Sequence, residues 1–545
     1  MGTERVTSDA ERWTSEGQTT LPGLLARTTA QWPDRPFLQF EDNAYTYAEF
    51  GAAVERMARC FVDLEVSPGD RVCCLMDNSD DMILVWFAVT RLGAVWVPLN
   101  TALKGEFLRH QLADSGASIF ICERDFVDRL APIEAQLPEL VTVIIRGGPT
   151  DDQQAPRYRS FDVLKQPSSS TLPQAEAGPG DLAMIIYTSG TTGLSKGCMI
   201  PHNYFCNVAG RLMETTDRTE TDVVLSAMPL FHLGALTNLV LLTLTAGAKA
   251  VVRARFSLSN FWSEVEKYGA TNVNLIGAML SLIANAPDTE VSRRCFGKIR
   301  SVLGTPFTPE LVEIWKRRFG VKIAGNHSFG MTEAVPIAYR RLGHERPGAS
   351  GQISPDFEVR LVDENGEECR PGEPGELMVR PRKPNIMFSG YWRRPAETLA
   401  LMRDLWFHTG DIVRIDEDRF LYFVDRGKDY LRKGGENISS FEMESVFVVH
   451  PEIAEVAVHS VPSEHTEDEL KVTAVLHPDS ALSEEALCRW VIDKVPYFAV
   501  PRFIEFRESL PRTATGRIRK AELRFDGVTY ATWDRAKSDV SVSRR

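Results

Sequence analysis

The sequence YTSGTTGLSKG, at residues 187–197, is a dense run of glycines and hydroxyl-bearing side chains that ends in Lys196 and Gly197. The glycines allow backbone N–H groups to come close to an anion, while the serines, threonines and lysine supply hydroxyl groups and a positive charge. An apolar run at residues 182–186 precedes the loop, so we expect the loop to leave the end of a buried strand. The pattern is not a Walker loop, because a glycine and an apolar stretch follow the lysine. It predicts a phosphate-binding loop, with a Gly- and Thr-rich surface turn as the alternative.

Five further short motifs follow this loop along the chain. They are FHLGA at residues 231–235, FGMTE at 329–333, WFHTGD at 406–411, DRGKDYLRKGGENIS at 425–439 and PRTATGRIRK at 511–520. In this order and spacing, the motifs resemble those of the adenylate-forming superfamily of acyl-CoA synthetases, luciferases and peptide-synthetase adenylation domains. The resemblance covers nearly the whole chain. Among the branches of the superfamily, FVDRGKDYLRKGGENIS is most similar to the carnitine/crotonobetaine-CoA ligases.

The composition is that of a folded protein with more than one domain. At 545 residues the chain is too long for a single hydrophobic core, and 43% hydrophobic with 25% charged residues is ordinary for a globular protein. A formal net charge of -12 argues against a general affinity for nucleic acid or for anionic membrane surfaces. An ATP molecule must therefore be held by local positive groups.

The cysteines and apolar stretches favour the cytoplasm. The nine cysteines show no C-x-x-C pair and no Cys/His cluster at zinc spacing, which argues against a disulfide framework or structural metal. The first residues are polar and carry acidic groups, unlike a secretory signal. The apolar stretches at 82–99 and 236–252 are interrupted by charged residues, so we interpret them as buried helices and strands rather than membrane spans.

The pattern of elements predicts an α/β fold. Residues 24–145 and 223–319 alternate helical stretches, such as 47–64 and 309–319, with strand-like ones, which favours parallel sheets with covering helices. After residue 348 short β segments separated by turns, such as 357–362, predict a small β subdomain, and beyond residue 426 a compact α+β lid is expected. We therefore predict a large N-terminal AMP-binding domain at residues 1–425 and a small C-terminal lid domain at 426–545, which the resemblance implies to be mobile.

The resemblance implies that a carboxylate attacks the α-phosphorus of ATP and expels pyrophosphate. The loop residues expected to hold the phosphates are Thr188, Ser189, Gly190, Thr191, Thr192, Gly193 and Lys196. Thr332 and Glu333 are expected at the α-phosphate and at Mg²⁺ respectively, with Gly330 and Met331 beside the nucleotide. One glutamate suffices, with Thr192 as the second expected metal contact, because Mg²⁺ takes few carboxylates besides phosphate and water. The alternative reading of FGMTE is a helix start capped by Thr332.

Two segments are expected to hold the adenine ring, as the resemblance implies. Gly304, Thr305 and Pro306 match the turn that lines the adenine pocket, although a plain strand-to-helix turn explains these three residues almost as well. Phe329 replaces the tyrosine usual in the family and can stack on adenine through its ring face.

The ribose contacts are expected from WFHTGD and the segment after it. By resemblance, Asp411 accepts hydrogen bonds from both ribose hydroxyls, and Arg426 donates from the other side. A carboxylate suits a diol because it offers acceptors only. The alternative for Asp411 is a turn residue after Gly410.

The acyl group is expected near FHLGA. In relatives this segment forms the wall between the acyl pocket and the CoA tunnel, so His232 either contacts the substrate or is packed against its apolar neighbours. Residues 276–280 and 326–328 complete the predicted pocket, with Asn326 and His327 as expected substrate contacts. This mixture of polar and apolar groups does not identify the acid.

The hinge and the C-terminal motif complete the predicted site. By resemblance, the lid rotates about Lys428, and Gly435 lets the backbone approach the pantetheine arm of CoA, with a β-turn glycine as the alternative. Relatives carry Gly-Lys where this chain has Gly516 and Arg517, and Arg517 is expected to bridge the carboxylate and the phosphate with a forked group. Lys520 substitutes for it only if the local backbone departs from that of the family.

The sequence therefore predicts an AMP-forming acid-thiol ligase that uses ATP, Mg²⁺ and CoA. The alternatives are a free-standing enzyme that loads an acyl group onto a carrier protein and a nucleotide-binding protein without catalysis. A small carboxylic acid is the expected partner, nucleic acid is not, and the protein is expected to be a monomer or homodimer.

Overall fold

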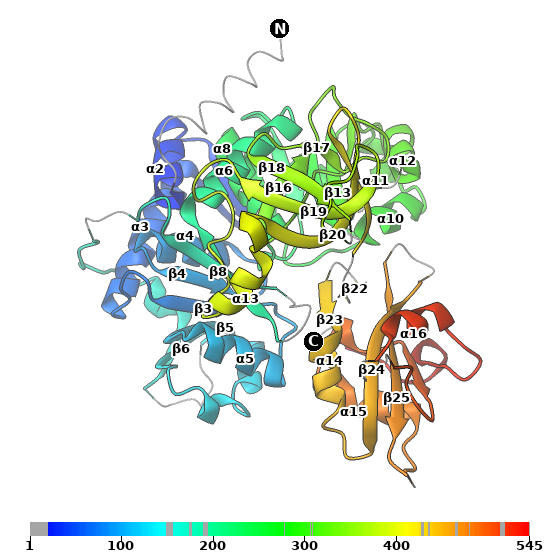
Figure 1. Ribbon diagram of the computed structural model, residues 1–545. Coiled ribbons are helices and arrows are strands. Elements are labelled where there is room, and N and C mark those ends of the chain that lie inside the picture. The colour runs from blue at the N-terminus through cyan, green and yellow to red at the C-terminus, as the bar shows by residue number, and fades with distance from the viewer. Residues whose placement is uncertain are drawn as a thin grey trace.

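The computed structural model describes residues 20–148, 156–173, 177–188, 194–276, 278–305, 307, 309–363, 365–426, 430–433, 436–463, 467–478, 480–512 and 518–543. These residues form three seven-stranded sheets, a four-stranded sheet and a two-stranded hairpin. Figure 1 shows the three large sheets gathered in one body, with the last part of the chain, orange to red, beside them.

The first sheet carries the predicted phosphate loop at one edge. Its order is β7-β6-β5-β3-β4-β8-β9, and neighbouring strands run parallel except for β8 and β9. The strands are β3 (Arg71–Leu75), β4 (Val95–Pro98), β5 (Ile119–Glu123), β6 (Thr142–Arg146), β7 (Tyr158–Ser160), β8 (Leu182–Thr188) and β9 (Lys196–Pro201). Its central strands are continuous apolar runs because both faces of a parallel sheet are covered.

The second sheet is built in the same way. Its order is β14-β13-β12-β10-β11-β1-β2, parallel except for the hairpin of β1 and β2. The strands are β1 (Pro36–Phe40), β2 (Asn43–Thr46), β10 (Val223–Ser226), β11 (Lys249–Val252), β12 (Asn272–Ile276), β13 (Ser301–Thr305) and β14 (Ile323–Gly325). Helices α9 (Phe261–Tyr268), α10 (Ala278–Asn285) and α12 (Pro309–Phe319) pack on it through a separate apolar cluster that includes Trp262 and Trp315.

The third sheet is antiparallel throughout. Its order is β15-β16-β17-β21-β20-β19-β18. The strands are β15 (Ser328–Met331), β16 (Ala334–Tyr339), β17 (Gly351–Ile353), β18 (Phe357–Val362), β19 (Pro374–Pro381), β20 (Phe407–Ile415) and β21 (Phe420–Arg426). The carboxyl end of the second sheet thus leads directly into the third, since only two residues separate β14 from β15.

The helices of the large part cover these sheets. They are α2 (Leu21–Gln31), α3 (Tyr47–Asp63), α4 (Asp80–Arg91), α5 (Gly105–Ser115), α6 (His202–Leu212), α7 (Leu233–Ala235), α8 (Leu242–Ala246), α9 (Phe261–Tyr268), α10 (Ala278–Asn285), α11 (Glu290–Arg294), α12 (Pro309–Phe319) and α13 (Pro395–Leu401). A π-helix, η5 (Leu236–Leu241), joins α7 to α8. The 3-10 turns are η1 (Arg124–Arg129), η2 (Glu134–Gln136), η3 (Phe161–Leu164), η4 (Met213–Thr215) and η6 (Arg403–Leu405).

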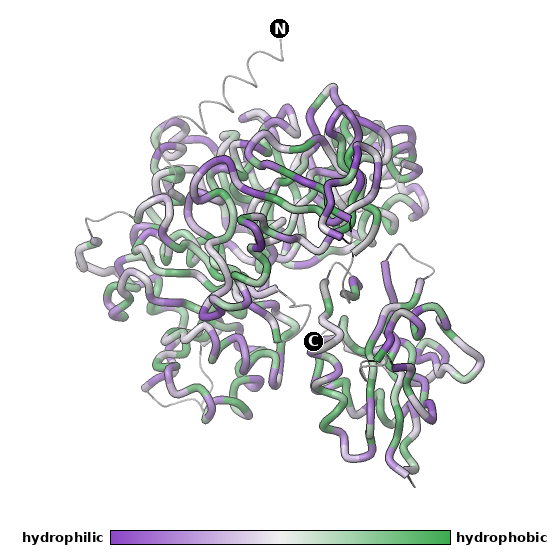
Figure 2. The backbone as a smooth tube through the Cα atoms, in the orientation of Figure 1, coloured by the Kyte–Doolittle hydropathy of each residue, from purple (hydrophilic) through white to green (hydrophobic). Residues whose placement is uncertain are grey.

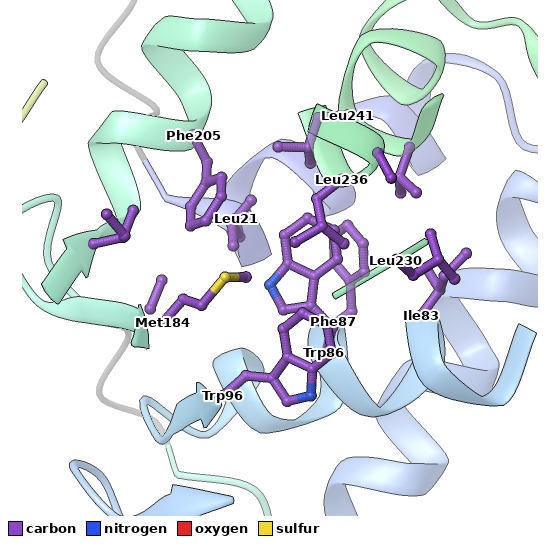
Figure 3. Close-up of a cluster of buried hydrophobic side chains, with 14 of the residues drawn as sticks. Leu21, Ile83, Trp86, Phe87, Trp96, Met184, Phe205, Leu230, Leu236 and Leu241 are labelled. Carbon is purple, nitrogen blue, oxygen red and sulfur yellow. The ribbon is translucent and has the colours of Figure 1, made fainter. Parts of the chain in front are cut away.

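Helix α4 lies at the centre of the largest core. All of its residues except Arg91 are buried, which explains why the helix is apolar on every side. The Trp86 ring stacks on Trp96 with centroids 5.6 Å apart and meets the edge of Phe205 at 5.7 Å. Figure 3 shows these aromatic rings packed with leucines of α2 and η5. In Figure 2 hydrophilic residues gather on the outer loops, in keeping with this buried centre.

The part of the chain from β22 onward, called the C-terminal part below, has its own apolar cluster. Its elements are the hairpin of β22 (Tyr430–Lys433) and β23 (Glu436–Ser439), α14 (Ser440–Phe447), β24 (Ile453–Val461), β25 (Glu469–Leu476), α15 (Glu484–Ile492), η7 (Tyr497–Ala499), β26 (Phe503–Phe506), α16 (Lys520–Asp526), β27 (Trp533–Asp534) and η8 (Arg535–Lys537). It touches the first sheet's helical cover, because the Lys104 ammonium donates to the backbone oxygen of Ile492 at 2.8 Å.

The predicted α/β fold class is confirmed. The helix expected over residues 47–64 is α3, and its start is fixed by a capping box between Thr46 and Glu49. The apolar stretches at 82–99 and 236–252 form buried helices and strands. In the part of the chain that the structure describes, no helix is both long enough and apolar enough to span a membrane. The domain division between residues 425 and 426 stays a prediction.

Candidate functional site

The predicted phosphate-binding loop lies between two antiparallel strands at the edge of the first sheet. The run 182–186 does form a buried strand, and Lys196 opens β9 directly opposite Thr188 in the pairing register. Gly197 is required here, because a Cβ at this position would lie 2.6 Å from Cγ2 of Ile185. Ser189, Gly190, Thr191, Thr192 and Gly193 lie outside the described residues.

The Lys196 side chain is largely buried, and its ammonium is held from two sides. Its Nζ lies 2.7 Å from Oε2 of Glu397, at the start of α13, and 5.3 Å from the centroid of the Tyr391 ring. A cation over an aromatic face is attracted by the negative charge of that face. The lysine therefore has a defined position at the edge of β9.

Thr332 and Glu333 form the turn of the hairpin between β15 and β16. The alternative reading of FGMTE as a helix start is therefore wrong, because the apolar residues on both sides pair across the hairpin. Gly330 allows the tight approach of its strands, since a Cβ there would lie 2.6 Å from the backbone oxygen of Ala334. The Glu333 carboxyl is 5% exposed and accepts a hydrogen bond from the Tyr391 hydroxyl at 2.7 Å.

The residues predicted at adenine lie where the second sheet meets the third. Gly304 is in β13, and a Cβ there would lie 2.4 Å from the backbone oxygen of Leu275, so no side chain fits. Thr305 ends the same strand. Phe329 is in β15, with its ring centroid 6.1 Å from that of Phe423 in β21. Met331 closes β15, and Pro306 lies outside the described residues.

The backbones of Asp411 and Arg426 pair on adjacent strands. Asp411 is in the middle of β20 and pairs in register with Arg426, the last residue of β21. The alternative of a turn residue for Asp411 is wrong, because the strand continues on both sides of it. This carboxylate is buried, and its backbone N–H donates to Oγ1 of Thr409 at 3.1 Å.

Asn326 and His327 occupy the connection between β14 and β15. The Asn326 side-chain oxygen accepts from the backbone N–H of Phe307 at 2.9 Å, so it ties the end of β14 to the segment after β13. The His327 ring is buried and lies 2.8 Å from Oγ1 of Thr215 through Nε2. Burial, with Arg218 and Arg340 nearby, lowers the pKa of His327 to about 3. This imidazole is therefore neutral at physiological pH.

His232 reaches the C-terminal part. Its Nε2 lies 2.9 Å from Oε1 of Glu436, which opens β23, and its ring lies 4.6 Å from that of Phe231. A cavity of about 110 Å³ lies at this junction, lined by His232 and Tyr187 from the large part and by Glu436 and other residues of the C-terminal part. The structure thus brings FHLGA, the strand before the phosphate loop and the β22–β23 hairpin together.

A second contact joins the C-terminal part to Ser195, near the end of the predicted phosphate-binding loop. Oε1 of Glu442, in the first turn of α14, accepts a hydrogen bond from the backbone N–H of Ser195 at 2.5 Å. Glu442 is 7% exposed, and burial raises the pKa of its carboxyl to about 7. This carboxyl therefore titrates near neutral pH while it touches the residue next to Lys196.

Lys520, the weaker candidate for the C-terminal lysine of the family, is engaged within the C-terminal part. Its ammonium lies 2.7 Å from Oγ of Ser440 and 2.7 Å from Oε1 of Glu444. Lys428, Gly435 and Arg517 lie outside the described residues, so their predicted roles stay predictions.

Four residues of the site were not predicted. Tyr391 and Glu397 reach Glu333 and Lys196, while Glu436 and Glu442 reach the large part from the other side. For Glu442 the sequence carried a signal of another kind, since Ser439 and Glu442 have the spacing of a helix start, which the structure shows. Glu436 lies within the motif at residues 425–439, and nothing in the local sequence marks Tyr391 or Glu397.

A magnesium ion fits the donor set of this site. No group of three or more His, Cys, Asp or Glu side chains that could hold a metal occurs among the residues described. Glu333 offers a single buried carboxyl, and its partner Tyr391 also contacts Lys196, at the end of the predicted phosphate-binding loop. That is the environment in which Mg²⁺ binds with ATP, since the ion takes one or two carboxylates together with substrate phosphates and water. Glu333 would hold the ion, which would neutralise phosphate charge.

Comparisons with known proteins identify the family. The model of the AMP-binding enzyme family matches residues 25–392, and that of the AMP-binding enzyme C-terminal domain matches residues 442–517. A crotonobetaine/carnitine–CoA ligase from Salmonella arizonae is 30% identical over 503 residues, which cover 90% of this chain and 96% of that protein. A feruloyl-CoA synthase from Amycolatopsis sp is 34% identical over 487 residues, covering 88% of this chain and 94% of that protein.

A solved structure has the same fold. It is a double mutant of the o-succinylbenzoate CoA synthetase from Bacillus subtilis, bound with its product analogue. The TM-score is 0.78 at 26% identity, with 94% of this chain and 98% of that chain covered. These matches confirm the resemblance to the adenylate-forming enzymes, including the branch of the carnitine ligases. The chain belongs to the AMP-binding enzyme family.

Proposed function

We propose that this protein joins a carboxylic acid to coenzyme A with ATP, through an acyl-adenylate, and releases AMP and pyrophosphate. This is the reaction expected from the sequence, and the relatives named above are CoA ligases and synthases. The protein is then an acid-thiol ligase whose first step uses ATP and Mg²⁺ and whose second step uses CoA.

One observation carries the proposal. Lys196, at the end of the phosphate loop, and Glu333, in the hairpin of the third sheet, both contact Tyr391. The first sheet thus supplies an ammonium for phosphate and the third sheet supplies a carboxyl for a divalent ion, and both groups lie beside the Tyr391 side chain. Phosphoryl and adenylyl chemistry needs this combination, because catalysis rests on positioning and on neutralising the charge of the phosphates.

The remaining residues take the roles that this reaction requires. Thr188, Lys196 and the loop between them bind the phosphates, and Glu333 binds Mg²⁺ while Thr332 contacts the α-phosphate. Asp411 binds the ribose, with Arg426 beside it on the neighbouring strand. Gly304 and Phe329 flank the adenine, and Arg517 bridges the carboxylate and the phosphate.

The acceptor of the acyl group is expected to enter between the two parts of the chain. His232 and Glu436 meet there at 2.9 Å, beside the cavity that both parts line. A pantetheine arm that reached this junction would pass His232 on its way to the adenylate. The nine cysteines are all free in the structure, which supports our proposal that the protein works in the reducing cytoplasm.

The test is to follow AMP release from ATP, Mg²⁺ and a panel of acids, with and without CoA. The panel includes crotonobetaine, carnitine, ferulate and o-succinylbenzoate, after the names of the relatives, together with short and medium fatty acids. We expect at least one acid to give CoA-dependent AMP release. Pyrophosphate exchange without CoA-dependent turnover would instead indicate an enzyme that loads a carrier protein. ATP binding without either activity would indicate a nucleotide-binding protein without catalysis.

A further inference from the structure

A short segment at residues 388–397 connects the third sheet to the edge of the first. Its backbone pairs with β9, because Ser389 N–H donates to the oxygen of Met199 at 2.8 Å and Met199 N–H donates to the oxygen of Gly390 at 3.0 Å. Trp392 N–H donates to the oxygen of Gly197 at 2.8 Å. The segment therefore extends the sheet beyond β9, the strand that Lys196 opens.

The same segment holds Glu333 twice. The backbone N–H of Phe388 donates to the backbone oxygen of Glu333 at 2.8 Å, and the Tyr391 hydroxyl donates to its Oε1 at 2.7 Å. Tyr391 is buried and packs edge-on against the Phe388 ring, with centroids 5.2 Å apart. Both the backbone and the carboxyl of Glu333 are thus fixed relative to β9.

Tyr391 also lies between two groups of opposite charge. Its hydroxyl contacts the Glu333 carboxyl, and its ring face lies 5.3 Å from the Lys196 ammonium. Of the ion pairs in the described part of the chain, none joins Lys196 to Glu333. If these two groups paired directly, each would neutralise the other and neither would be available to phosphate or metal.

Lys196 has a different counterion in Glu397. The Glu397 side chain is 40% exposed, so its pair with Lys196 is weak and open to exchange with another anion. Arg394 lies 3.6 Å from the other oxygen of Glu397 and also contacts Asp114 at 3.1 Å. Glu397 therefore retains a cationic neighbour when Lys196 leaves it.

We propose that Tyr391 is a positioning residue that keeps Lys196 and Glu333 apart and available for the metal-bound triphosphate, and that Glu397 is the exchangeable counterion of Lys196. This inference rests on the proposed function. The hydroxyl of Tyr391 orients the carboxyl that binds Mg²⁺, and its ring supports the lysine that binds phosphate. The triphosphate displaces Glu397, which then pairs with Arg394.

The experiment measures nucleotide binding rather than turnover. The full-length protein is titrated calorimetrically, without acid or CoA, with an ATP analogue that has a methylene bridge between the α and β phosphorus atoms. Each titration is done with Mg²⁺ and with a chelator, and Mn²⁺ in place of Mg²⁺ is followed by its electron paramagnetic resonance spectrum. The variants are Tyr391→Phe, Tyr391→Leu and Glu397→Gln.

We expect Tyr391→Phe to reduce the gain in affinity that Mg²⁺ provides by about tenfold, because a hydrogen bond to a charged group is lost while the ring stays in place. Metal-free binding should change little. Tyr391→Leu should reduce binding both with and without the metal, since Lys196 and Glu333 are then free to pair. The Mn²⁺ signal of the nucleotide-bound protein should change in both variants.

Tyr339→Phe is the matched control for the hydroxyl. The Tyr339 hydroxyl also donates to a carboxyl, Oε2 of Glu214 at 2.6 Å, and the residue is fully buried away from the loop. A general loss of core stability would affect Tyr339→Phe and Tyr391→Phe alike. Equal Mg²⁺ effects in these two variants would overturn the role of Tyr391.

Glu397→Gln tests the counterion with tripolyphosphate as the probe. Removal of the negative charge should strengthen metal-free binding of tripolyphosphate by about two- to fivefold, a small effect because the pair is partly exposed. Glu485→Gln, which removes an exposed carboxylate of another pair on α15, is the control. Unchanged or weaker binding in Glu397→Gln would overturn the role of Glu397.

The outcomes separate this inference from the proposed function. A wild-type protein that binds no nucleotide and releases no AMP with any acid contradicts the function itself. A wild-type protein that binds the nucleotide and forms AMP, with variants that behave like their controls, overturns the positioning roles alone.

Discussion

Two carboxyl groups from different parts of the chain reach the end of the predicted phosphate-binding loop, and they differ in exposure and in the kind of contact they make. Glu397 belongs to the large part, is 40% exposed and pairs with the Lys196 side chain at 2.7 Å. Glu442 belongs to the C-terminal part, is 7% exposed and accepts from the backbone of the adjacent Ser195 at 2.5 Å. One contact is a partly solvated ion pair and the other is a buried hydrogen bond.

These differences indicate what each contact responds to. The Glu397 pair sits on a framework of three sheets, so it changes only when another anion competes for the lysine. The Glu442 contact forms only when α14 lies against the loop, and it requires a carboxyl to leave water. The first is therefore expected to respond to the nucleotide, and the second to pH and to the position of the C-terminal part.

The largest effect is expected from Glu333→Gln, which changes a carboxyl that is held within the large part of the chain. Loss of the carboxyl that would hold Mg²⁺ should lower the rate of adenylate formation by about 100- to 1,000-fold, as removal of a key charge-stabilising group does. The rate is measured as pyrophosphate exchange with the best acid of the panel. Thioester formation from preformed adenylate should fall much less. An equal loss in both half-reactions would contradict the assignment of Glu333 to the metal.

The next largest effect is expected for the Glu442 contact, which should depend on pH through the pKa of this carboxyl. Burial raises this pKa from the ordinary 4.5 to about 7, so the docked contact favours the protonated carboxyl. The contribution of this contact to the free energy of docking is complete below pH 4.5 and is lost as the pH rises through 7. The difference is about 3 kcal/mol, because one pKa unit corresponds to about 1.4 kcal/mol. Docking of the C-terminal part should therefore weaken between pH 5 and pH 8.

Hydrogen exchange at the Ser195 amide measures this docking, after correction for the intrinsic pH dependence of exchange. In Glu442→Gln the neutral amide oxygen still accepts from Ser195, so protection should no longer depend on pH. A wild-type protein whose protection is the same across this range, or a glutamine variant with the wild-type slope, would contradict the role of Glu442.

Much of the fold follows from local patterns. The helix at residues 309–319 and the strand at 357–362 were predicted with the bounds that the structure shows, because apolar spacing and turn residues at their ends are local signals. The turn at Thr332 and Glu333 is different. A Thr followed by an acidic residue is also typical of a helix start, and only pairing between β15 and β16 decides for the hairpin.

The missing part of the site is non-local. The contact between Tyr391 and Glu333 joins residues 58 positions apart, and that between Ser195 and Glu442 joins residues 247 positions apart. Motifs identify groups that are expected to touch the nucleotide, because the chemistry of binding requires particular residue types at particular spacings. Groups that only hold those motifs in place are common residue types, and they become visible when the sheets are assembled.

A smaller effect is expected from Arg517→Lys, which extends the comparison to the motif near the end of the C-terminal part. The planar guanidinium can bind two anions with parallel hydrogen bonds, and a compact ammonium binds them as a point charge. Adenylation should therefore fall by about tenfold, as expected for the loss of one charge-assisted hydrogen bond. Thioester formation from preformed adenylate should be nearly unaffected. Equal changes in both half-reactions would remove the assignment of Arg517 as the bridge.

The smallest effect is expected at Glu436, which, like Glu442, joins the C-terminal part to the large part. Its pair with His232 at 2.9 Å is only partly shielded, so it resembles the Glu397 pair in strength although it lies at the same junction as Glu442. Glu436→Gln keeps an acceptor for the imidazole and removes the charge, which should slow CoA-dependent turnover by about two- to fivefold. Stopped-flow turnover with saturating ATP and acid measures this change, with Glu485→Gln as the control. If Glu436→Gln slowed CoA-dependent turnover as much as Glu442→Gln does in the same assay, charge at this junction, rather than burial, would decide how the C-terminal part docks.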